Sequence, residues 1–194
     1  MGLQKTILCS DASRSCGEDP AGSAGCYEEF FFISLPLPWD RKVWATRNVP
    51  ENLRALTTSL EEEKPQIRIM AIAPDPDLNT PETQVIRYKT SSQNKGFAGY
   101  DRSAYSLPLE EVAALLAHLI HGTPLEAPIK PTAQEERDVR ELFVCTHGSR
   151  DICCGKLGYP VYQEIREKYA RPSNGSVKVW RVSHTGGHRF APTL

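Results

Sequence analysis

The sequence predicts an α/β fold in which mixed sheets are flanked by helices. Short segments with the two-residue period of strands alternate with segments in which apolar residues recur every three or four positions. At about 150 residues per domain, a chain of 194 residues corresponds to roughly one and a third domains. Charge is divided unevenly, with 15 basic and 20 acidic residues in 1–140 against 8 and 4 in 141–194. We therefore expect two units with different surfaces.

The composition excludes several classes of protein. Apolar residues make up 40% of the chain and charged residues 24%, which is typical of globular domains and argues against disorder or a coiled coil. The totals of 23 basic and 24 acidic residues give no overall field for binding nucleic acid. No apolar run approaches the roughly 18 residues of a membrane span, and the first residues lack the apolar core of a signal peptide. We expect a soluble, cytoplasmic protein.

The first unit, residues 1–130, is predicted to contain four strands and two helices. A loop rich in Gly, Ser and Asp comes first, and the elements follow in the order strand, helix, strand, strand, strand, helix. The loop and the six elements comprise residues 10–25, 28–35, 50–63, 66–72, 84–88, 96–106 and 108–121. This order is that of a thioredoxin-like unit, although several α/β folds share it.

Local signals set the ends of these elements. The apolar run 30–33 predicts a buried strand that ends before Pro36. Pro50 suits the first turn of the following helix, in which leucines recur at helical spacing, and Pro65 ends it. The next segments alternate between polar and apolar residues as strands do. Gly122 is the stop signal of the last helix.

The second unit, residues 131–194, follows a proline-containing linker at 123–136. It is predicted to contain a strand at 141–144, a helix at 160–169 and an alternating strand at 177–182. A thioredoxin-like unit would need two further strands and a helix. The sequence therefore predicts tandem thioredoxin-like units, the second of which is incomplete.

Cysteines and histidines follow both strands of the second unit. Cys145 follows the first strand, with Cys153 and Cys154 eight and nine positions later, and His184 and His188 follow the other strand. The carboxyl ends of parallel strands lie at the same edge of a sheet, so we expect the cysteines to face the histidines across a few ångströms. Two glycines separate the histidines and exclude a stable helix there, so a turn must present the imidazoles close to a metal.

The remaining cysteines and histidines have simpler explanations. The three N-terminal cysteines have no partner histidine and are expected to be structural or incidental, and three single histidines are expected at the surface or as helix caps. These residues are Cys9, Cys16, Cys26, His118, His121 and His147. Two Cys with two His suit tetrahedral zinc, or a binuclear iron–sulfur cluster in which two His replace two Cys on one iron. Spacing alone does not decide between these two centres.

Five segments resemble the sucrase/ferredoxin-like family. They are CS at 9–10 with GEDPAGSA at 17–24, LPLPW at 35–39, VCTHGSRDICCG at 144–155 and WRVSHTGGHRFA at 180–191. The resemblance implies a thioredoxin-like ferredoxin with a [2Fe–2S] cluster held by Cys145, Cys154, His184 and His188. Cys154 is preferred to Cys153 because the second ligand of the family directly precedes a glycine. Family members continue beyond the position of Leu194, so the resemblance implies a C-terminally truncated chain.

The function that this resemblance implies is that of a soluble iron–sulfur electron-transfer or redox protein, not of a hydrolase. The alternatives are a structural zinc module with the same four ligands and a thiol redox protein that uses Cys153 and Cys154, which lack the usual two-residue spacer. We expect an acidic or flavin-containing redox partner, steered by basic residues near the ligands, whose alternative role is a solvated basic face. These residues are Arg150, Lys156, Arg181 and Arg189.

Overall fold

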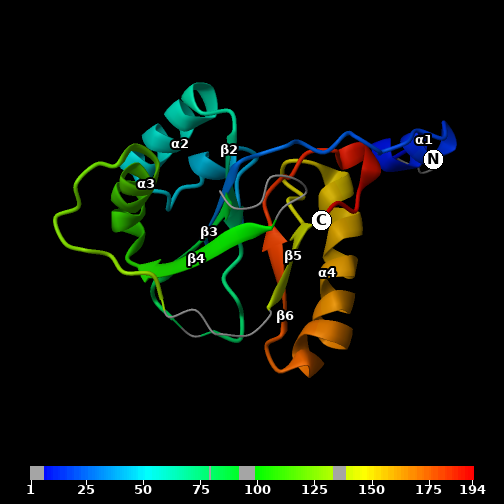
Figure 1. The fold of residues 1–194 in the computed structure, drawn as a ribbon. Helices are drawn as coiled ribbons and strands as arrows, with labels where there is room; N and C mark the ends of the chain where they lie inside the picture. The colour runs from blue at the N-terminus through cyan, green and yellow to red at the C-terminus, as the bar shows by residue number, and fades with distance from the viewer. Residues whose placement is uncertain (1–6, 79, 92–98, 133–138) are drawn as a thin grey trace. The chain divides into compact units, whose positions relative to one another are not determined.

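The computed structural model describes residues 7–78, 80–91, 99–132 and 139–194. The described residues have a mixed α/β structure with six β-strands and four α-helices (Figure 1). They divide into two compact units, one made of residues 26–136 and the other of residues 1–25 together with 137–194. The sequence predicts two domains, 1–130 and 131–194, and this division stays a prediction.

The unit of residues 26–136 contains four strands in the order β4-β3-β1-β2. The strands are β1 (Glu29–Ser34), β2 (Ile67–Ile72), β3 (Thr83–Thr90) and β4 (Tyr100–Leu107). β1 is parallel to β2 and antiparallel to β3, and β3 is antiparallel to β4. Every residue of β1 except Phe30 is buried, as the apolar run predicts for a central strand.

Two helices cover one face of these strands, α2 (Glu51–Glu63) and α3 (Val112–His121), as Figure 1 shows. Phe31 and Ile33 alternate along β1 and belong to the same buried cluster as Leu53 of α2 and Leu116 of α3. A short 3-10 turn (Leu109–Glu111) precedes α3. Both helices of this unit therefore contribute to the same core.

The unit of residues 1–25 and 137–194 contains β5 (Arg140–Cys145) and β6 (Val177–Val182), which pair in parallel. Helical turns begin at Ile152 and continue without a break to Ala170. They consist of a π-helical turn (Cys154–Gly158), α4 (Tyr159–Ile165) and a second π-helical turn (Arg166–Ala170), and a 3-10 turn (Arg171–Ser173) leads towards β6. This strand–helix–strand arrangement carries the candidate site.

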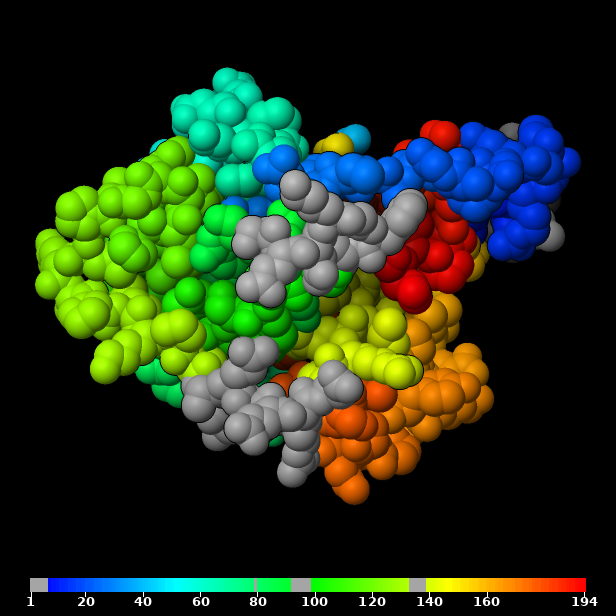
Figure 2. Space-filling view, viewed as in Figure 1, coloured from blue at the N-terminus to red at the C-terminus, as the bar shows by residue number. Residues whose placement is uncertain are grey.

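The N-terminal segment belongs to this same unit. It forms a short helix, α1 (Cys9–Ser15), which contacts the 3-10 turn His188–Phe190 near the other end of the sequence. In Figure 2 the two segments lie side by side, coloured blue and red. The sequence predicts a loop at 10–25, so the helix corrects that expectation for its first six residues.

The other expected elements are present, with ends that differ by at most four residues. Residues 96–98 of the expected fourth strand and 133–136 of the linker lie outside the described residues. Gly122 ends α3 in the left-handed conformation, with φ of 72°, as its role as a stop signal requires. The tandem thioredoxin-like organisation itself stays a prediction.

Candidate metal centre

The parallel pair β5 and β6 brings the two ligand-bearing loops together. Cys145 is the last residue of β5 and is in register with Val182, the last residue of β6. The N–H of Thr146 donates to the Val182 carbonyl at 3.1 Å, which extends the pairing by one residue. His184 follows two positions later, so both loops leave the same edge of the pair, where parallel α/β structures build their sites.

The loop after Cys145 is short and ends in a helix. The Asp151 carboxylate accepts the backbone N–H of Cys153 at 2.9 Å and caps the helical turns that begin at Ile152. Cys154 therefore lies in the first turn of a helix, whereas the sequence predicts a loose loop at this position. This arrangement gives the Cys154 side chain a fixed direction.

Gly158 allows this helix to lie directly against the end of β5. A Cβ atom at this position would lie 1.9 Å from the carbonyl oxygen of Cys145, well inside van der Waals contact. Gly155 makes a similar approach, because its Cβ would lie 2.7 Å from the Cα of Gly148. The glycines thus set the short distance between Cys145 and the turn that carries Cys154.

Three potential ligand atoms meet at this position. One atom from each of Cys145, Cys154 and His184 lies within 4.8 Å of the others. Cys154 Sγ and His184 Nδ1 lie 3.5 Å apart. Both cysteines are fully buried and the histidine is partly buried. Two thiols and an imidazole with converging donor atoms are a donor set that suits zinc and related metals.

His188 lies outside this group of three. Its ring centre is 6.0 Å from that of His184, and its side chain is 42% exposed. The His188 Nε2 atom lies 3.7 Å from the Asp151 carboxylate. The structure therefore brings together three of the four residues expected as ligands and places the fourth beside them, on the solvent side.

The two buried thiols share a hydrogen bond that makes them unequal. Donation from the Cys154 thiol lowers the pKa of Cys145 to about 5, against the opposing effect of burial. The N–H groups of His147 and Thr185 and the charge of His184 act in the same direction. The same hydrogen bond and burial raise the pKa of Cys154. In the metal-free chain this pair holds one thiolate at neutral pH.

Asp151 stays ionised beside the histidines. Partial burial acts to raise the pKa of Asp151, but the hydrogen bonds from Cys153 and the nearby His188 and His184 lower it overall. A carboxylate next to a ligating imidazole orients the ring and increases its basicity. From the sequence, Asp151 could have been identified only as a candidate helix N-cap, since Asp is a favoured residue at that position.

His147 is a buried residue of the site, whereas the sequence predicts a surface or capping role. His147 is 3% exposed, and its Nδ1 accepts a hydrogen bond from the backbone N–H of His184 at 3.3 Å. The ring therefore carries its proton on Nε2 when neutral. It joins the Cys145 loop to the His184 loop. No sequence signal separates this histidine from an exposed one.

The basic residues near the site have different surroundings. Arg150 and Lys156 are exposed. Arg181 is partly buried, lies 4.8 Å above the Tyr159 ring and donates to Thr146 Oγ1 at 3.3 Å, so it packs β6 against the helix. The expected acidic or flavin-containing partner stays a prediction, and Arg181 is not part of a free basic face.

The two glycines between the histidines adopt the left-handed conformation. Gly186 has φ of 98° and Gly187 φ of 62°, values that other residues adopt only with strain. A Cβ on Gly186 would meet no atom within 4 Å. The shape of the turn therefore requires the glycines. The expectation from the sequence, that they allow the backbone to approach the site closely, does not hold at Gly186.

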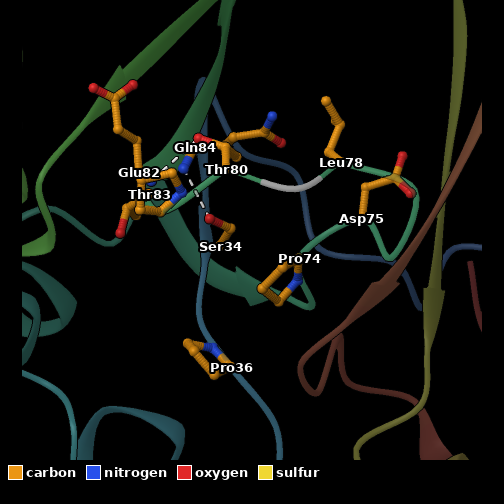
Figure 3. A pocket seen from close by; sticks show the side chains of 10 residues that line it. Ser34, Pro36, Pro74, Asp75, Leu78, Thr80, Glu82, Thr83 and Gln84 are labelled. Atoms are coloured by element: carbon orange, nitrogen blue, oxygen red, sulfur yellow. Dashed lines mark hydrogen bonds between the residues drawn. The ribbon is translucent and has the colours of Figure 1, made fainter.

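A small pocket in the unit of residues 26–136 lies apart from these residues in the chain. Its volume is about 100 Å³ (Figure 3). It is lined by Ser34, Pro36, Pro74, Asp75, Leu78, Thr80, Pro81, Glu82, Thr83 and Gln84. The Ser34 hydroxyl accepts the backbone N–H of Gln84 at 2.8 Å, and the Asp75 carboxylate accepts that of Asp77. These polar groups hold the turn, and we assign the pocket no function.

Three curated relatives are each named "Altered inheritance of mitochondria protein 32". The relative from Candida glabrata is 24% identical over 97% of this chain and 61% of its own length. The relative from Meyerozyma guilliermondii is 35% identical over 29% of this chain and 21% of its own, and that from Clavispora lusitaniae 30% over 45% and 33%. The chain thus spans less than two thirds of each relative. No solved structure matches it.

These relatives correct the predicted function. They are named for the inheritance of mitochondria and not as iron–sulfur electron carriers, and no cluster is shown. The prediction of an iron–sulfur electron-transfer protein is therefore wrong. No helix among the described residues is long and apolar enough to cross a bilayer.

The match to a protein family covers most of the chain. The profile of the sucrase/ferredoxin-like family covers residues 20–194, which include both ligand-bearing loops and all the strands. The ligand roles and the truncation that the resemblance implies stay predictions. The chain belongs to the sucrase/ferredoxin-like family.

Proposed function

We propose that this chain is a metal-binding protein in which Cys145, Cys154 and His184 hold a single metal ion, zinc being the ion that the donor set favours. The observation that carries the proposal is the 3.5 Å separation of Cys154 Sγ and His184 Nδ1. Zn–S bonds of about 2.3 Å and Zn–N bonds of about 2.0 Å place sulfur and nitrogen about 3.5 Å apart on a tetrahedral ion. The pair is therefore already spaced as two ligands of one ion.

His188 is the proposed fourth ligand. Two imidazoles bound to one tetrahedral ion have ring centres about 5 Å apart, against 6.0 Å between His184 and His188. A movement of about 1 Å would bring the second ring into place. The Asp151 carboxylate lies 3.7 Å from His188 Nε2 and would orient the ring through this nitrogen, which leaves Nδ1 for the metal.

A metal at this position would connect three segments that follow β5, start the helix and follow β6. When bound, it supplies folding free energy, because the ligands converge only in the folded chain. The chain's own contribution is to hold the donors close together through Gly158 and the helix cap at Asp151. These contacts make the site compact before any ion arrives.

Metal analysis of the full chain tests the proposal. We expect one equivalent of zinc per chain, and Co²⁺ in its place should give the absorption of a site with two thiolates. Cys145→Ser, Cys154→Ser and His184→Ala should each lower the affinity for zinc at least a hundredfold. Cys26→Ser is the control, since this exposed cysteine contributes no atom to the group of three.

Each outcome of this experiment decides something. Iron with equimolar acid-labile sulfide would identify the [2Fe–2S] cluster that the resemblance implies and would overturn the single-ion proposal. A wild-type chain that binds neither zinc, cobalt nor iron would overturn the metal site altogether. Loss of metal in Cys153→Ser with retention in Cys154→Ser would exchange the two cysteines.

A role connected with mitochondria is the cellular part of the proposal. The support is the name that the three relatives share, which refers to the inheritance of mitochondria. Fluorescence imaging of the tagged chain should place it at or in mitochondria. A diffuse cytoplasmic signal would instead agree with the expectation from the sequence. In cells that lack the protein, wild type but not Cys145→Ser should restore the normal distribution of mitochondria.

We also propose that residues 26–136 form a thioredoxin-like unit. The support is the strand order β4-β3-β1-β2, with β2 parallel to β1 and the other two strands antiparallel to their neighbours. β1, α2 and β2 follow one another as a parallel strand–helix–strand unit. An experimental structure of the full chain with a different order of these strands would refute this assignment.

A further inference from the structure

The N-terminal segment of residues 8–18, which we call the N-terminal clamp, contacts the turn that carries His188. Its helix α1 (Cys9–Ser15) packs on the 3-10 turn His188–Phe190 (Figure 2). The two residues that α1 buries are Ser10 and Ser13, three positions apart on one face. The contact joins two parts of the sequence that are more than 170 residues apart.

A polar chain fixes one end of this contact. The Ser13 hydroxyl donates to Glu18 Oε2 at 2.7 Å, and the other carboxylate oxygen of Glu18 pairs with Arg189 Nε at 2.6 Å. Arg189 directly follows His188. Because Ser13 holds the carboxylate in place, the ion pair has a defined geometry although both side chains are partly exposed.

An apolar cluster fixes the other end. Leu8, Cys153 and Ala191 are each at most 5% exposed and pack together, with Leu157 against them. Cys153 directly precedes the ligand Cys154, and Ala191 follows the His188 turn. Leu8 of the clamp therefore contacts both ligand-bearing segments, the one with Cys154 through Cys153 and the one with His188 through Ala191.

From these contacts we propose that the N-terminal clamp positions His188 relative to the two cysteines, with Leu8 and Glu18 as positioning residues. The inference rests on the proposed metal site. The turn it holds follows two glycines with positive φ, and the His188 ring must move by about 1 Å to reach a shared ion. Contacts on both sides of that turn restrict its movement and so increase the time for which His188 stays in reach.

Metal titration of positioning variants tests the clamp in the full chain. Leu8→Ala removes apolar contact without changing charge, and Glu18→Gln removes the ion pair. Each should lower the affinity for Co²⁺ and zinc about tenfold, the usual effect of losing a residue that supports a ligand. The sulfur-to-cobalt charge-transfer band should keep its intensity, since both thiolates remain bound. Arg189→Gln combined with Glu18→Gln should cost no more than either change alone.

Two controls separate positioning from other causes. Glu164→Gln removes one negative charge from an exposed ion pair with Lys168 in the same unit and should leave the affinity unchanged. In a His188→Ala chain, the clamp variants should produce no further loss. A tenfold loss that persists without His188, or a loss in Glu18→Gln with none in Leu8→Ala, would overturn the positioning role.

A measurement without metal tests the clamp independently of the proposed site. Hydrogen exchange of the peptide that contains Gly187, His188 and Arg189 should be at least threefold faster in Leu8→Ala and Glu18→Gln than in wild type, with exchange in β5 unchanged. Unchanged exchange in this peptide would overturn the clamp. Absence of metal binding in wild type would instead overturn the proposed function, so the two failures are distinct.

Discussion

Replacing Gly158 by alanine tests how closely the helix must approach β5. A helix interior favours alanine over glycine by about 1 kcal/mol, so propensity alone predicts a more stable protein. The structure predicts the opposite, because the new Cβ would lie 1.9 Å from the Cys145 carbonyl oxygen. A tolerable contact needs about 3 Å, so the strand end or the helix must move by about 1 Å.

The opposing effects give a net magnitude. Overpacking against backbone costs about 3 kcal/mol, and the propensity gain of about 1 kcal/mol leaves a loss of about 2 kcal/mol in the free energy of unfolding. Urea unfolding of the metal-free full chain, followed by tryptophan fluorescence, measures it. Gly155→Ala, with a closest approach of 2.7 Å to Gly148 Cα, should lose less.

The outcome also bears on the metal site. Because the displaced atom belongs to Cys145, Gly158→Ala should weaken zinc binding together with stability. A variant that is as stable as wild type or more so would show that the two elements are not in close contact, and the reasoning about the compact site would fail with it.

Three further predictions concern groups whose surroundings the structure defines. In the metal-free chain, thiolate absorption near 240 nm should persist at pH 7 and disappear as the pH falls through about 5. The cause is the hydrogen bond from the Cys154 thiol, which lowers the pKa of Cys145. In Cys154→Ala the thiolate absorption should therefore disappear at a higher pH than in wild type. Asp151→Ala should lower the free energy of unfolding by about 1 kcal/mol in urea, since it removes a helix cap. Glu29→Gln should cost about 3 kcal/mol by leaving the Arg87 guanidinium without its buried carboxylate, and limited proteolysis should then cleave residues 26–136 first.

Elements with a strong local pattern could be predicted from the sequence. The leucine spacing at 50–63 predicts a helix, and α2 spans Glu51–Glu63. The alternation at 177–182 predicts a strand with the ends that β6 has. In both cases apolar residues at regular spacing face a core, so the local signal and the tertiary packing agree.

Other features depend on contacts between distant residues and have no local signal. The segment that contains α1 is rich in Gly, Ser and Asp, and the helix is supported by the packing of Leu8 and the turn at His188–Phe190. His147 is buried because β6 places the backbone of His184 within 3.3 Å of its ring. The three converging donors follow from parallel pairing of β5 and β6, whereas the position of His188 depends on a turn whose shape the spacing alone does not define.

The composition of one compact unit from residues 1–25 and 137–194 has a consequence for synthesis on the ribosome. Glu18 leaves the peptidyl-transferase centre 171 residues before Arg189, its partner in the ion pair. At about 5–20 residues per second, that delay is roughly 10–30 s. Residues 26–136, whose strands and helices are contiguous in sequence, have time to fold first. Until residues 137–194 are synthesised, the N-terminal segment lacks the surface on which it packs and stays accessible to chaperones and proteases.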